Sequence, residues 1–143
     1  MITEDYVSFE IAKLLKEKGF DEICRAVYVI RDERLVHCTR HNIFDFTNNE
    51  RIKEVGDGDT AILAPTIQMT MRWLREVHHI HINLDIHWLY FANTLGWMYT
   101  IEKILENGVD YVSSEGDEND KTFYSTYEEA CESAIKYCLK NLI

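Results

Sequence analysis

Ten consecutive residues, from His79 to Trp88, alternate strictly between polar and apolar side chains. Successive side chains of a β-strand point to opposite faces, so this pattern predicts a strand with one buried face and one solvent-exposed face. Such one-sided strands are typical of antiparallel sheets. The segment therefore indicates an antiparallel sheet with helices packed on its apolar face.

Amphipathic periodicity predicts helices in three other segments. These segments are residues 3–18, 65–78 and 125–141. Thr3 is the expected N-cap of the first helix, and Gly19 stands where a C′ glycine would end it. Thr126 and Glu129 have the spacing of a capping box at the start of the last helix.

Strand-forming residues fill most of the remaining chain. The expected strands are 24–31, 35–39, 97–105 and 109–113, with a short piece at 122–124. Asn107-Gly108 predicts a hairpin turn, and residues 40–64 form an irregular connection with at most one short strand. The predicted order is α-β-β-(loop)-α-β-β-β-α. This is an α+β fold, expected as a single domain of residues 1–143.

The chain is acidic, with 25 Asp and Glu against 15 Lys and Arg among 143 residues, a formal net charge of −10. Direct nucleic-acid binding depends on basic residues that replace phosphate counterions, so this balance argues against it. The sequence contains no apolar run of membrane-spanning length and no signal peptide. We therefore expect a cytoplasmic protein.

Histidines on the alternating strand are the candidate metal ligands. His79 and His81 are two residues apart, so their side chains would project the same way and could chelate zinc with a third ligand from a neighbouring strand. The alternative is a solvated polar face that happens to use histidine. We predict no catalytic residue and no cofactor, because the sequence lacks a nucleophile elbow and a phosphate-binding glycine loop.

Four cysteines, Cys24, Cys38, Cys131 and Cys138, include no Cys-x-x-Cys pair, so we expect them to be buried as small apolar side chains. Five aromatic residues cluster between positions 88 and 99, namely Trp88, Tyr90, Phe91, Trp97 and Tyr99. Because no basic residue is interleaved with them, they indicate core and sheet packing rather than base stacking. Any that are exposed would mark a protein interface.

Three blocks of sequence carry a resemblance to a known family. They are Thr3-Glu4-Asp5-Tyr6-Val7-Ser8-Phe9-Glu10, Ala64-Pro65-Thr66 with Trp73-Leu74-Arg75-Glu76-Val77-His78, and Thr126-Tyr127-Glu128-Glu129-Ala130-Cys131-Glu132. Together they resemble a family of small Bacteroides proteins of unassigned activity, often associated with prophages or mobile elements. The resemblance implies a bacterial, phage-related setting and transfers no catalytic residue.

These observations favour a non-enzymatic accessory protein that acts through contacts with a protein partner. A homo-oligomer, in which the partner is another copy of the same chain, is one form of this hypothesis. A metal-dependent enzyme that uses His79 and His81 is the first alternative. The second alternative is an acidic nucleic-acid mimic or antitoxin-like inhibitor, for which the charge of −10 is the motivation.

Overall fold

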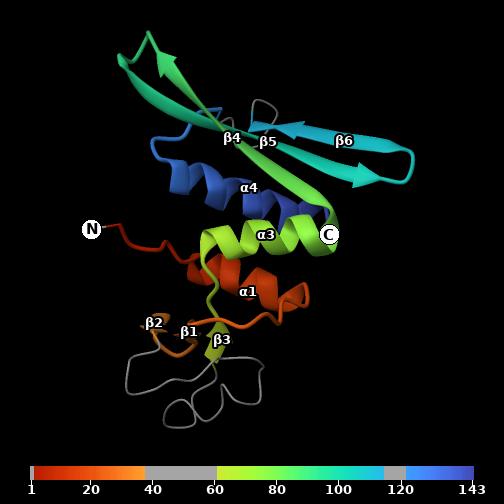
Figure 1. Cartoon of the computed structure of the whole chain (residues 1–143). Coiled ribbons are helices and arrows are strands. Elements are labelled where there is room, and N and C mark those ends of the chain that lie inside the picture. The colour runs from red at the N-terminus through yellow and green to blue at the C-terminus, as the bar shows by residue number, and fades with distance from the viewer. Residues whose placement is uncertain (1, 38–60, 115–121) are drawn as a thin grey trace. The chain divides into compact units, whose positions relative to one another are not determined.

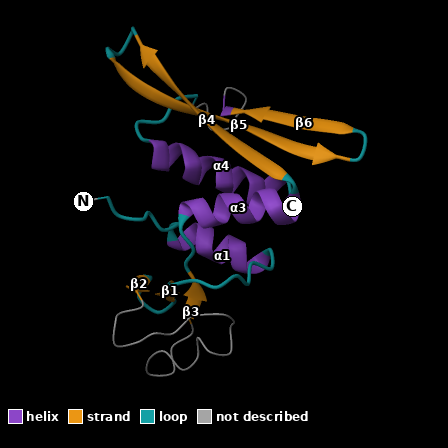
Figure 2. Ribbon diagram, in the orientation of Figure 1, coloured by secondary structure: helices purple, strands orange, loops and turns teal. Residues whose placement is uncertain are grey.

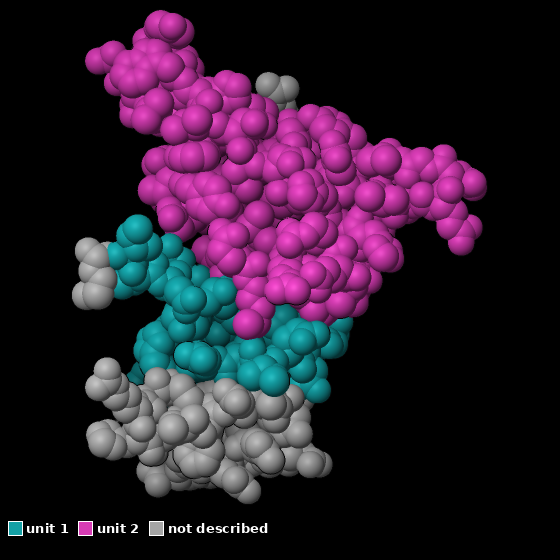
Figure 3. Space-filling model, in the orientation of Figure 1, with its two compact units in different colours: residues 1–66 teal, residues 67–143 magenta. Residues whose placement is uncertain are grey.

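The computed structural model describes residues 2–37, 61–114 and 122–143. The chain divides into two compact units, Met1–Thr66 and Ile67–Ile143 (Figure 3). Each unit contains its own three-stranded antiparallel sheet. The prediction of one domain over the whole chain stays a prediction.

The first unit combines one helix with a small sheet. Its helix is α1 (Phe9–Glu17), and its strands are β1 (Ala26–Val29), β2 (Arg34–His37) and β3 (Ala61–Leu63) in the order β2-β1-β3. The central strand β1 is buried at three of its four positions. Strand β3 is the short strand expected within residues 40–64; residues 38–60, with Cys38 and most of that connection, lie outside the described residues.

The first helix begins later than predicted. Ser8 is the N-cap, and its side chain accepts a hydrogen bond from the backbone N–H of Ile11 at 3.3 Å. Residues just before it are extended instead: Tyr6 forms a β-bridge with Thr66, and the N–H of Val7 donates to the carbonyl of Pro65. The prediction of Thr3 as N-cap is therefore wrong, because these backbone bonds compete with helix formation. Its end is as expected, with Gly19 at a φ of 85°.

The second unit has two helices on one face of a longer sheet (Figure 1). Its helices are α3 (Ile67–His78) and α4 (Tyr127–Asn141). Its strands are β4 (Ile80–Leu89), β5 (Thr94–Leu105) and β6 (Gly108–Ser113), in the order β4-β5-β6. The α+β class and the order of elements predicted from the sequence are confirmed.

Helix α4 packs on β4 and β5, and α3 packs on β4 and on α4. The apolar stripe of α4 is fully buried, and Thr126 caps the helix by accepting from the N–H of Glu129 at 3.1 Å. The buried residues of α4 are Ala130, Cys131, Ala134, Ile135, Cys138 and Leu139. The buried side chains of the sheet beneath them come from the neighbouring strands β4 and β5: Ile80, Ile82, Tyr99 and Ile101.

The alternating segment forms β4 nearly as predicted. Its partners in β5 run from the pair Ile80–Lys103 to the pair Leu89–Thr94. His79 lies outside the strand, with a φ of 58°, and therefore does not continue the alternation. The turn to β5 is shorter than expected, because β5 already begins at Thr94 rather than at Trp97.

Beyond β6, a short segment returns to the sheet. Ser114 is buried, and its hydroxyl accepts from the N–H of Tyr99 at 3.3 Å and donates to the carbonyl of Thr122 at 2.9 Å. Tyr124 then forms a β-bridge with Trp97, where a short strand was predicted. This segment extends the sheet on the side of β5 that β6 leaves open.

Candidate interaction surface

Strands β4 and β5 are longer than the helix that covers them. Helix α4 has 15 residues and extends about 22 Å at 1.5 Å per residue. Strand β5 has 12 residues and extends about 40 Å at 3.4 Å per residue. The helix therefore cannot cover the whole strand, and the sheet reaches past it at both ends, with the β4–β5 turn at one end and the β5–β6 turn at the other (Figures 1 and 2).

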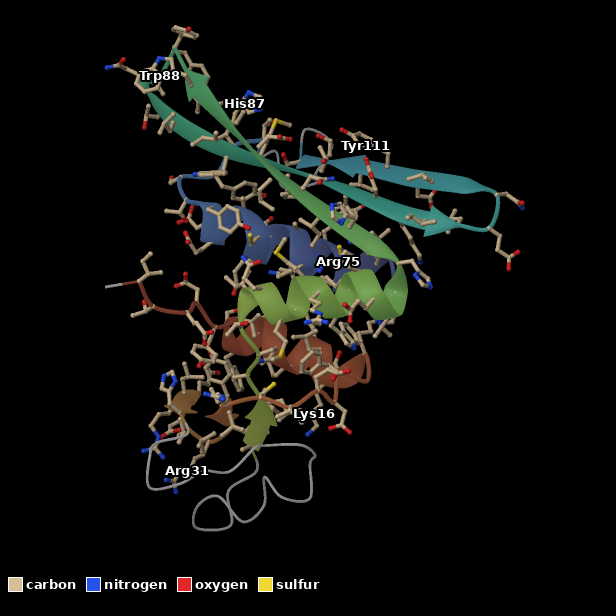
Figure 4. All side chains as sticks on the ribbon, viewed as in Figure 1. Lys16, Arg31, Arg75, His87, Trp88 and Tyr111 are labelled. Atoms are coloured by element: carbon tan, nitrogen blue, oxygen red, sulfur yellow. The ribbon has the colours of Figure 1, made fainter. Side chains whose placement is uncertain are left out.

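We refer to residues 85–98, the outer part of the β4–β5 hairpin, as the hairpin arm. Figure 3 shows it as a projection of the second unit, and Figure 4 places Trp88 and His87 near its outer end. Its apolar side chains are largely open to solvent: Tyr90 is 88% exposed, Phe91 84%, Leu95 50%, and Ile86 and Trp88 48% each. The prediction of core packing is therefore wrong for Trp88, Tyr90 and Phe91, because they lie beyond the part of the sheet that α4 covers.

Three of these side chains, Ile86, Trp88 and Leu95, continue the apolar face of the core. In an antiparallel pair, directly opposed residues share a face. The register therefore places Ile86 and Trp88 on the same face as the buried Ile80 and Ile82. With 150–250 Å² available per aromatic side chain, the five exposed residues present roughly 600 Å² of apolar surface. That value is at the upper end of the largest patch on a typical monomer.

The base of the arm is held firmly. Trp97 and Tyr124 exchange two backbone hydrogen bonds of 2.8 and 2.7 Å, and the Trp97 ring meets the Tyr127 ring edge-on at 5.3 Å. The Tyr124 hydroxyl is 2.7 Å from that of Ser133 in α4. The arm is therefore attached to the first turns of α4, and the aromatic residues Trp97 and Tyr99 pack as predicted.

On the opposite face of the arm, Gly96 allows neighbouring side chains to pack closely. A methyl group at this position would lie 2.7 Å from Cδ1 of Leu89 and 3.2 Å from Cβ of Phe123. The Phe123 ring also meets the His87 ring at 5.9 Å. The missing side chain of Gly96 thus gives Leu89 and Phe123 their packing space.

The other end of the sheet, at the β5–β6 turn, is also uncovered. Ile104, Val109 and Tyr111 are exposed there, and Tyr111 is labelled in Figure 4. Residues 102–111 nevertheless contain four charged side chains, whereas the arm contains only Asp85. Interface cores are rich in aromatic residues and poor in charge, so the arm is the better candidate for a binding surface.

The histidines predicted as metal ligands lie at the start of this hairpin. His79 precedes β4 in a left-handed backbone conformation, and His81 lies in β4 opposite Glu102. Within residues 2–37, 61–114 and 122–143, no three His, Cys, Asp or Glu side chains are close enough together to hold a metal ion. Among the described residues, the geometry therefore adds no third ligand to His79 and His81.

The described cysteines are buried, as expected. Burial raises the pKa of Cys24 and of Cys138 to about 12 and that of Cys131 to about 11. These thiols are therefore protonated near neutral pH. Only the deprotonated thiolate acts as a nucleophile or a metal ligand, so these three side chains are not in the reactive form at that pH.

His78, at the end of α3, has its ring 4.5 Å from that of Trp73, and its Nε2 is buried without a hydrogen-bond partner among the described residues. Burial lowers the pKa of His78, with further contributions from Lys103 and His79. This histidine packs against Trp73 at the end of α3, apart from the arm.

In the described part of the chain, no helix is long and apolar enough to cross a membrane. Comparison with protein-family models, with curated proteins and with solved structures found no match to this chain. The resemblance to Bacteroides proteins stays a prediction from the sequence.

Proposed function

We propose that this protein is a non-enzymatic accessory protein that binds another protein chain through the hairpin arm. The observation that supports the proposal most strongly is the exposure of Trp88, Tyr90 and Phe91 on a projection with one formal charge. Large aromatic side chains at the centre of a contact dominate protein–protein binding energies. Leaving them in water has no benefit for folding.

The anchoring of the arm supports the same function. Trp97, Tyr124 and Tyr127 hold its base against α4, so Ile86 and Trp88 are presented on paired strands, and Tyr90 and Phe91 on the short turn that joins these strands. A binding element of this kind loses little conformational entropy when a partner binds. The arm is thus preorganised for contact.

The test is an affinity capture with purified full-length chain, comparing wild type with a triple variant in which Trp88, Tyr90 and Phe91 are each replaced by serine. The matched control replaces Ile104, Val109 and Tyr111 by serine at the opposite end of the sheet. Because both sets are exposed, both variants should fold, as checked by circular dichroism and thermal unfolding. A bound protein, which includes a second copy of this chain, should be lost only in the arm variant.

Equal binding by wild type and the arm variant would refute the proposal. Loss of binding in the control with retention in the arm variant would move the surface to the β5–β6 end. Absence of any bound protein in wild type, together with a monomeric mass, would also count against it.

A further inference from the structure

Strand β4 is an edge of the sheet, and its backbone groups can be assigned to the inside or to the open side. Trp97 exchanges both of its backbone hydrogen bonds with Tyr124, so its N–H and C=O point away from β4. In an antiparallel ladder this direction alternates from residue to residue. Gly96 and Met98 therefore point towards β4, where they face His87 and Asp85.

The same alternation fixes the rest of β4. The carbonyl of His79 accepts a hydrogen bond from the N–H of Ile104 in β5. This agrees with the alternation, in which the backbone N–H and C=O groups of odd-numbered residues point towards β5. Even-numbered positions consequently direct their N–H and C=O to the open edge. Ile80 and Ile82 are buried, so the accessible part of this edge consists of Leu84, Ile86 and Trp88.

An exposed strand edge with apolar side chains is a template for pairing with another strand. We propose that the occupant of this edge is β4 of a second copy, in an antiparallel arrangement whose two-fold axis passes through Ile86. This proposal names the partner of the arm and so rests on the proposed function. A two-fold pairing is self-complementary, as the commonest dimers are.

The register follows from which residues then lie opposite each other. Pairing about Ile86 sets Leu84 against Trp88 of the second copy, and each opposed pair with outward backbone groups exchanges two hydrogen bonds. The same register sets Asp85 against His87 of the second copy. An imidazole N–H can donate to a carboxylate there, because side chains of such directly opposed residues are close.

A shift of the axis to Asp85 would oppose the two Asp85 carboxylates, which is unfavourable. A shift to Leu84 would extend the pairing over positions 80 and 82, which are buried. Of these three registers, the one about Ile86 is favoured by both charge complementarity and access.

The arm sets an upper limit on the area of such a dimer. If all of its roughly 600 Å² of exposed apolar surface were buried in each copy, the contact would reach about 1,200 Å² in total, the lower end of the range for specific interfaces. The net charge of −10 repels a second copy at long range, but the arm contributes only Asp85 to it. The contact thus lies where repulsion is weakest. Interfaces at the small end of the range are typical of weak, transient contacts, so we expect an affinity on the order of micromolar.

The test is sedimentation equilibrium of the full chain at up to about 100 μM, well above the micromolar affinity expected of a small interface. Wild type should show twice the monomer mass of 16.9 kDa. Ile86→Pro removes an outward N–H without touching the β4–β5 ladder, so it should be folded and monomeric. Tyr111→Pro is the matched control, because the same alternation directs its N–H outward from β6; it should remain dimeric.

Charge variants test the register and do not depend on proline being tolerated. His87→Asp places a carboxylate against Asp85 of the second copy at two symmetric positions and should weaken the dimer about tenfold. Adding Asp85→His in the same chain restores the opposite pairs and should restore the wild-type affinity. Failure of the double variant to recover would overturn the register about Ile86.

A monomeric wild type would overturn the self-pairing, as would a folded Ile86→Pro variant that stays dimeric. Monomeric wild type that still captures another protein through Trp88, Tyr90 and Phe91 would leave the proposed function intact. Monomeric wild type that captures nothing would remove both.

Discussion

Ser114 offers the sharpest test of how the sheet of the second unit is held together. Its hydroxyl is buried and makes two hydrogen bonds, from the N–H of Tyr99 and to the carbonyl of Thr122. Replacement by alanine removes both contacts, one to a buried N–H and one to a partly buried carbonyl, at about 1–2 kcal/mol each. We therefore expect Ser114→Ala to lower the free energy of unfolding by about 2–4 kcal/mol.

Urea unfolding followed by circular dichroism measures this change, and thermal unfolding should show a midpoint lowered by roughly 10 °C. Ser125→Ala is the control, since Ser125 is exposed and its substitution should stay within about 0.5 kcal/mol of wild type. A Ser114→Ala variant as stable as this control would show that the two hydrogen bonds contribute nothing, and the account of the segment after β6 would fail.

Three further changes have defined outcomes. Thr126→Ala removes the cap on the N–H of Glu129 and should lower the free energy of unfolding by about 1 kcal/mol, while Thr126→Ser should recover most of it in urea titrations. Gly96→Ala should destabilise the protein by about 1–3 kcal/mol through overlap with Leu89. This explanation requires the same substitution to cost less in a Leu89→Ala background, and the difference is measured as a coupling energy. Burial lowers the pKa of His78, so the unfolded state binds this proton more tightly. The free energy of unfolding should therefore fall as the pH drops below about 6.5, and it should fall less in the His78→Phe variant. Equal pH slopes for the two proteins would contradict the packing of this ring.

Local pattern predicted most of the fold because it reports directly on local geometry. The alternation from Ile80 to Trp88 specified a one-sided strand, and the Thr126–Glu129 spacing specified the start of α4. The N-terminal helix boundary could not be predicted the same way. Thr3 and Ser8 are equally good caps, and the choice is made by backbone bonds from Tyr6 and Val7 to residues some 60 positions away.

The candidate site depends on a comparison that no local pattern contains. Ile82 and Ile86 have the same residue type, strand and face, yet Ile82 is buried and Ile86 is half exposed. The difference arises because α4 is shorter than the strands it covers. Sequence alone therefore indicated where the aromatic residues cluster, but it left open which of them are in contact with solvent.

Because the β4–β5 hairpin is longer than helix α4, different parts of the same two strands are under different evolutionary constraints. Substitutions near Ile82 and Tyr99 change how well the chain folds, because these side chains fill the space beneath α4. Substitutions near Trp88 and Phe91 leave that space untouched. The exposed side chains of the arm can consequently change and adapt to new contacts over evolutionary time while the core stays constant. A mutational scan would separate them from the packed positions, which include Gly96 within the arm.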